Sequence, residues 1–142
     1  MSDVWILVAD GSEARIFSAR HRHAPLSLID TLTHEASRLH PRDLVTDAPG
    51  RVHDRFGPGR HSIDNREQVR TEERQRFARE IATHLAEAHR QKRFGELVVM
   101  AAPAFLGVLR ESFSKPLAAA VIAEVAKDLV AHDPADIQAH VP

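Results

Sequence analysis

The sequence predicts an α/β protein built on a mixed β-sheet. Residues 4–9 are apolar throughout without alternation, as expected of a strand buried on both faces. Residues 14–19 and 26–33 alternate instead, and a turn signal precedes each, which is typical of antiparallel strands. From residue 65 onward helical and strand patterns alternate, and parallel strands need such helical crossovers. We therefore expect a three-strand antiparallel meander followed by β-α-β-α units, with helices on the faces of the sheet.

The meander follows from turns and alternation. Asp10-Gly11 predicts the first turn, and residues 21–25 predict the second. In the second strand, Ile16 and Phe17 should lie on opposite faces. In the third strand, alternation predicts that Leu26, Leu28 and Leu32 share one face, with Ser27, Ile29 and Thr31 on the other.

Residues 35–64 predict a long loop rich in arginine, glycine and proline. They contain few large apolar residues, and a loop of this length in a compact domain is usually functional or disordered. Its basic side chains are Arg38, His40, Arg42, Arg51, His53, Arg55, Arg60 and His61.

A long helix should follow the loop. Asn65 can cap its start, with Gln68 three residues later as in a capping box. Apolar residues recur at helical spacing in its second half, whereas residues 66–76 are nearly all polar and should face solvent. Gly95 is the expected stop.

The C-terminal third predicts a strand, a helix, an ambiguous segment and a last helix. Residues 96–102 form a buried strand that Pro103 ends, and residues 105–113 are an amphipathic helix that Lys115-Pro116 breaks. Residues 117–130 fit either a helix or a strand. Asp133-Pro134 starts a short final helix. No repeat or linker interrupts the chain, so residues 1–142 should form one domain.

Composition excludes several classes of protein. The 142 residues include no cysteine, which excludes disulfide scaffolds and thiolate sites. No apolar run approaches the length of a membrane span, and the N-terminus lacks a signal-peptide pattern, so we expect a cytoplasmic protein with no membrane partner. The net charge is −1, but residues 15–93 hold 16 basic and 11 acidic side chains. The basic residues are mostly arginine, which suits bidentate contact with phosphate or carboxylate.

Several motifs resemble, in order, those of the bacterial host attachment family, proteins described as required for attachment to host cells. The motifs are VADGSEARIF at 8–17, RDLVTDAPGR at 42–51, GPGRH at 57–61, RFA at 76–78, AAPAFLGVLR at 101–110 and EVAKDL at 124–129. That family resembles in turn the middle domain of eukaryotic and archaeal peptide release factors and of Pelota. The resemblance implies a mixed sheet of the kind grouped with translational machinery components, and it implies that residues 120–128 form a strand.

The resemblance also draws attention to the loop. In release factors the corresponding place carries a Gly-Gly-Gln tip that reaches the peptidyl-transferase centre. This chain has Gly57-Pro58-Gly59-Arg60-His61-Ser62 there and no Gly-Gly-Gln, so the release chemistry does not transfer. What the resemblance leaves is a surface on which arginines and backbone N–H groups at a helix start can contact phosphates.

Two kinds of site remain open at this point. The residues for nucleic-acid or partner binding are Arg42, Arg51, Arg55, Arg60, His61, Arg66 and Arg70. Alternatively, the loop arginines form salt bridges with Asp43, Asp47 and Asp54 and hold the loop to the sheet or to a second subunit. Asp10 and Pro103 follow two predicted strands and could border a crevice, or Asp10 could simply form the hairpin turn.

The function we expect is binding rather than catalysis. The ten histidines lack the spacing of a known metal motif, and no nucleotide fingerprint is present, so no metal and no cofactor is predicted. The main hypothesis is a non-catalytic cytoplasmic factor that docks on RNA or the ribosome through the 38–61 loop. The alternatives are a dimeric protein-interaction adaptor and a small hydrolase or nuclease that uses Asp10.

Overall fold

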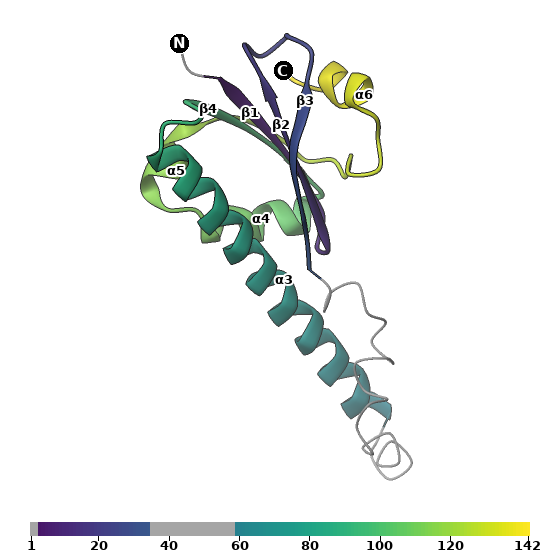
Figure 1. Cartoon of the computed structure of the whole chain (residues 1–142). Coiled ribbons are helices and arrows are strands. Elements are labelled where there is room, and N and C mark those ends of the chain that lie inside the picture. Colours follow the sequence, from purple (N-terminus) through teal and green to yellow (C-terminus); the bar gives the residue numbers. More distant parts are fainter. Residues whose placement is uncertain (1–2, 35–58) are drawn as a thin grey trace.

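The computed structural model describes residues 3–34 and 59–142 of the chain, with the side chains of 60–65 outside this description (Figure 1). The described elements are β1 (Val4–Ala9), β2 (Glu13–Ala19), β3 (Ser27–Thr33), α3 (Gly59–Arg90), β4 (Glu96–Ala101), α4 (Pro103–Ser112), α5 (Lys115–Ala120), β5 (Val121–Val125) and α6 (Pro134–Ala139). The strands form one sheet in the order β3-β2-β1-β4-β5. The three N-terminal strands pair antiparallel, whereas β4 is parallel to both β1 and β5. The predicted α/β class and mixed sheet are confirmed.

The sheet has a hydrophobic core on each face. Trp5 and Leu7 of β1 pack under α3, α4 and α5, whereas Ile6 and Val8 pack with Ile137 of α6 on the other face. Figure 1 shows α6 on the opposite side of the sheet from α3 and α4. This two-sided burial explains why β1 is apolar at every position and β4 is apolar from Leu97 to Ala101.

The C-terminal segment is held to its face by one side chain of the meander. The Arg15 guanidinium donates to the carbonyl oxygens of Val130 (2.9 Å) and His132 (2.8 Å) and lies 5.0 Å from the centre of the Phe17 ring. Asp133 caps α6 by accepting from the Asp136 N–H at 2.8 Å, as the sequence predicted.

The third strand departs from simple alternation. Phe17 pairs with Leu28 but Ile16 pairs with Asp30, so Ile29 is an extra residue in a β-bulge. The bulge reverses the faces: Leu26 packs on the α6 side and Leu32 on the α3 side. The prediction that Leu26, Leu28 and Leu32 share a face is therefore wrong.

The ends of α3 also differ from the prediction. The helix begins at Gly59 rather than at Asn65, so the last residues of the predicted loop are helical. No proline or glycine occurs in residues 60–64, and extending an existing helix costs far less than starting one. At the other end α3 stops at Arg90, and Lys92 takes the left-handed conformation with φ of 62°. Gly95 instead donates its N–H to the Asp3 carbonyl at 3.0 Å, beside β4.

Residues 117–130, which fit either a helix or a strand, contain part of a helix followed by a strand. Ser114 caps α5, accepting from the Leu117 N–H, and Pro116 fits the first turn of this new helix. The strand β5 then covers residues 121–125, so the predicted strand at 120–128 is confirmed for these residues and ends three residues early.

Candidate functional site

The first half of α3 projects beyond the sheet (Figure 1). We call residues 59–72 the α3 arm. The whole helix has 32 residues and is about 48 Å long, whereas from Arg66 onward, where its side chains are described, the first buried residue is Phe77. From Arg66 to Glu72 every residue is exposed. The prediction that residues 66–76 face solvent is confirmed for all of them except Glu73 and Arg74, which are partly buried. The exposed stretch offers a surface that the core does not use.

Three arginines line one face of this projecting region. Arg66, Arg70 and Arg74 follow one another at four-residue spacing, which places them in a row on the helix. The row ends over the β1–β2 turn, where a Cβ atom added to Gly11 would lie 3.2 Å from Cγ of Arg74. Glycine at position 11 therefore allows the close approach of the Arg74 stem. We call Arg66, Arg70 and Arg74 the arginine row.

The arginine row has acidic neighbours, but not along its whole length. Glu67 flanks the row, whereas helical spacing puts Glu72 on the opposite side of α3. Glu73 is held by other partners, since its carboxylate accepts from Arg76 at 2.6 Å and from His34 at 2.5 Å. The row is therefore not neutralised by ion pairs among the described residues.

The structure places the predicted binding residues in three groups. Arg66 and Arg70 lie in the arginine row. Arg60 and His61 lie in the first turn of α3, and nothing is described of their side chains. Arg42, Arg51 and Arg55 lie outside the described residues. Sequence reasoning did not single out Arg74, although its four-residue spacing from Arg70 is a signal that could have found it.

A cluster around His34 fixes the base of the arm. His34 follows β3, is 9% exposed and stacks on Phe77 of α3 with ring centres 5.4 Å apart. Its Nε2 donates to Glu73, and its Nδ1 lies 3.6 Å from Glu80. Glu73 therefore holds the imidazole by a hydrogen bond, whereas the half-exposed Glu80 only approaches the opposite ring nitrogen. No spacing signal predicts this contact, because residues 35–58 separate β3 from α3 in the sequence.

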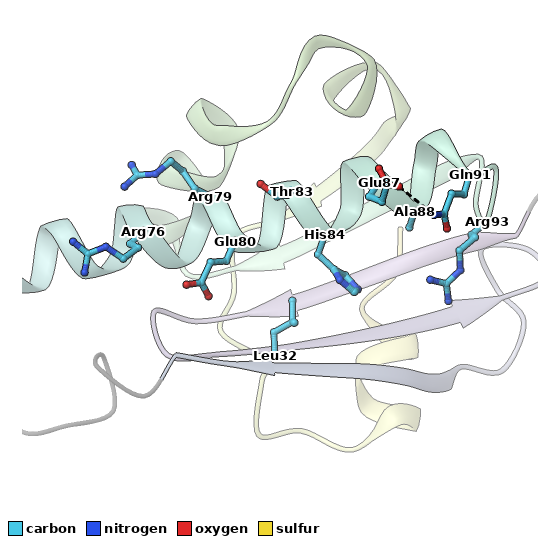
Figure 2. Close-up of a pocket in the computed structure, with 10 residues that line it drawn as sticks. All are labelled: Leu32, Arg76, Arg79, Glu80, Thr83, His84, Glu87, Ala88, Gln91 and Arg93. Atoms are coloured by element: carbon cyan, nitrogen blue, oxygen red, sulfur yellow. Dashed lines mark hydrogen bonds between the residues drawn. The ribbon is translucent and has the colours of Figure 1, made fainter.

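Beyond this cluster an open groove of about 770 Å³ separates α3 from β3 (Figure 2). Leu32 of β3 lines it together with charged and polar side chains of α3, and Gln91 and Arg93 lie at its end beyond the helix. The α3 residues are Arg76, Arg79, Glu80, Thr83, His84 and Glu87. His84 crosses the groove, and its Nε2 lies 3.0 Å from Oδ2 of Asp30 in β3. Hydrogen bonds from Arg90 lower the pKa of the Glu87 carboxyl below its usual value, so this residue is ionised at neutral pH.

Asp10 and Pro103 are neighbours at one end of the sheet. Ala9 and Ala101 pair in register, so the two residues follow adjacent parallel strands. The Asp10 carboxylate is engaged in the turn, where its Oδ1 accepts from the N–H groups of Ser12 and Glu13, both at 2.8 Å. Its geometry is that of a turn residue, and among the described residues it belongs to no group of three or more side chains that could hold a metal ion.

Removing the Asp10 carboxylate should destabilise the protein. We expect Asp10→Ala to lower the free energy of unfolding by about 1–3 kcal/mol, because two partly buried N–H groups lose their acceptor. Asp10→Asn keeps an acceptor oxygen and should lose less. Urea denaturation of both variants measures the difference, and equal losses would contradict this role for the carboxylate.

The described part of the chain offers no metal or membrane site. Residues 3–34 and 66–142 contain no group of three or more metal-ligating side chains. Among the helices described, none is long and apolar enough to span a bilayer.

Comparison with known proteins identifies the family. No curated protein matches the chain. A family model described as "Protein required for attachment to host cells" matches residues 5–141, which includes every strand and helix described above apart from Val4 at the start of β1. The chain therefore belongs to the family of proteins required for attachment to host cells.

Proposed function

We propose that this protein is a non-catalytic cytoplasmic binding factor that docks on RNA or on the ribosome. The arginine row of α3 carries the proposal, together with the basic segment 38–61 that precedes it in the sequence. An effect on host attachment would then follow indirectly, through regulation inside the bacterium.

The chemistry of the arginine row suits phosphate. Arginine offers five N–H donors in a planar fork and keeps its charge at all physiological pH values. Consecutive members of the row are one helical turn apart, about 6 Å along the axis, so neighbouring phosphates of one strand can be contacted together. Contacts to the phosphate backbone give affinity and position without reading sequence. The described arm has no aromatic side chain on which bases could stack, which favours backbone contact over sequence-specific recognition.

The resemblance to release factors supports the ribosome as the source of that RNA. In those proteins the segment between the third strand and the long helix reaches into the ribosome. Here the corresponding segment leads into a helix that projects from the sheet. The Gly-Gly-Gln motif is absent, so the proposal concerns docking and includes no release reaction.

Co-sedimentation with ribosomes tests the proposal. We expect the protein to bind at about 50 mM salt and to lose most of this binding at about 200 mM, because phosphate contacts release counterions. Reversing two charges with Arg66→Glu and Arg70→Glu should lower the slope of log affinity against log salt by about 2, one for each lost contact.

A matched control separates site from net charge. Arg20→Glu with Lys115→Glu changes the net charge equally at two exposed positions away from the arm, and it should leave binding unchanged. Absence of binding at both salt concentrations, or equal weakening by both double variants, would refute docking through the arm. Capture that survives nuclease and high salt would assign the surface to a protein partner instead.

A further inference from the structure

The carboxylate of Glu73 is shared between His34 and Arg76. Its Oε2 accepts from Nε2 of His34 at 2.5 Å, and its Oε1 accepts from Nη1 of Arg76 at 2.6 Å. The side chains of His34 and Glu73 are only 10% and 13% exposed, so little solvent competes for the contact between them. Each oxygen of this carboxylate is therefore engaged by a donor that does not belong to the arginine row.

Glu73 lies beside the arginine row on the helix. Arg70 stands three residues before it, a spacing that brings two helical side chains within reach of each other. Side chains on a helix lean toward its N-terminus, which directs Glu73 toward the turn that contains Arg70. Glu67 has the same spacing from Arg70 on the other side, but it is exposed, and exposed pairs contribute little. Glu73 is thus the carboxylate best placed to neutralise a member of the row.

His34 holds Glu73 from outside the helix. Its backbone N–H donates to the Ser12 carbonyl at 3.0 Å, and its ring stacks on Phe77. The imidazole is therefore fixed by the β1–β2 turn and by the core, and it draws Oε2 of Glu73 toward the end of β3. Arg76 cannot do the same, because its side chain is 54% exposed and comes from α3 itself.

We propose that His34 is a positioning residue that keeps the arginine row available for phosphate. The inference rests on the proposed function and names a residue that controls the same surface. By engaging Oε2 of Glu73, His34 prevents an ion pair between Glu73 and Arg70. A carboxylate and a phosphate compete for the same guanidinium donors, because each can accept two parallel hydrogen bonds from them. Without His34, Glu73 would occupy Arg70 and the row would lose one phosphate contact.

Replacing His34 with phenylalanine tests this role. The variant keeps an aromatic ring on Phe77 but loses both ring nitrogens. In co-sedimentation with ribosomes, we expect the slope of log affinity against log salt to fall by about 1, as for the loss of one phosphate contact. If this variant fails to fold, His34→Leu takes its place with the same expected change. His84→Phe is the matched control: it breaks the contact with Asp30 of β3, frees no carboxylate beside the row, and should leave the slope unchanged.

A rescue experiment separates positioning from a purely structural role. Adding Glu73→Gln to His34→Phe removes the competing charge, so this double variant should recover the wild-type slope. A structural defect would not recover, because the second change removes a further charged contact with Arg76. Glu80→Gln changes the charge equally at the other carboxylate near His34, ten positions from Arg70, and it should not rescue the slope.

Nuclear magnetic resonance of the protein without ligand gives an independent readout. The side-chain Nε–H signal of Arg70 should shift in His34→Phe and return in the double variant with Glu73→Gln. An Arg70 signal that does not move, ribosome binding that His34→Phe leaves unchanged, or a loss that Glu73→Gln does not rescue would each overturn the inference. A wild-type protein that binds no ribosomes would instead overturn the proposed function, and the Arg70 signal would still decide whether His34 keeps Glu73 away from the row.

Discussion

Replacing Phe77 with alanine is expected to lower the free energy of unfolding by about 3–5 kcal/mol. The ring is fully buried and lies between two others, 5.4 Å from the centre of His34 and 6.2 Å from the centre of Phe105. Its removal therefore leaves a cavity at the point where α3, α4 and the end of β3 meet. Because a domain of this size is stable by only about 5–15 kcal/mol, the loss is a large fraction of the total.

Urea denaturation followed by tryptophan fluorescence measures this loss. Trp5 is the single tryptophan and is buried against Phe94, with ring centres 4.6 Å apart. Phe113→Ala is the matched control, because Phe113 is only partly buried at the border of the same core. Phe113→Ala should lower the free energy of unfolding clearly less than Phe77→Ala does. Comparable losses at the two positions would show that Phe77 does not occupy the centre of this core.

Much of this fold could be predicted because buried positions show in the sequence as a pattern of apolar residues. The bounds of β1 are those predicted. A strand covered on both faces is apolar along its whole length, so the first polar residues mark its ends. Ile16 packs in the core on the α3 face of the sheet and Phe17 in the core on the α6 face, as alternation requires. The same rule failed in β3, because one inserted residue reverses every face beyond it and no residue in the sequence marks the bulge.

Local signals failed where a longer-range contribution outweighed them. The Asn65 cap is worth about 1 kcal/mol, which does not stop a helix whose preceding residues can also be helical. Gly95 favours a helix end, but the chain must turn at Lys92 to begin β4 at Glu96 beside Asp3. In both cases the position of a neighbouring element, not local preference, decides where the helix ends.

The candidate site was less predictable than the fold. Composition identified the basic middle of the chain, and Arg66 and Arg70 lie on an exposed surface there. The groove and the His34 cluster depend on pairs such as Asp30 with His84, which are 54 positions apart and follow no motif. Only the packing of α3 beside β3 brings such residues together.

Replacing His34 with alanine should lower the free energy of unfolding by about 2–4 kcal/mol, the combined size of an aromatic stack and a charge-assisted hydrogen bond. The side chain stacks on Phe77 and donates to Glu73, and both partners are largely buried. Glu80→Ala is the control: its carboxylate is 52% exposed and 3.6 Å from the ring, so its loss should stay within about 0.5 kcal/mol. Urea denaturation compares the two variants.

A double-mutant cycle then isolates the hydrogen bond from the stack. Glu73→Ala removes the carboxylate but leaves the His34 ring on Phe77, and the double variant with His34→Ala removes both. Since the two side chains are in direct contact, we expect a coupling energy of at least about 1 kcal/mol. Additive losses would mean that His34 holds the meander to α3 by stacking alone. A measured coupling would mean that a single charged contact fixes β3 to α3 at the point where the arm leaves the sheet.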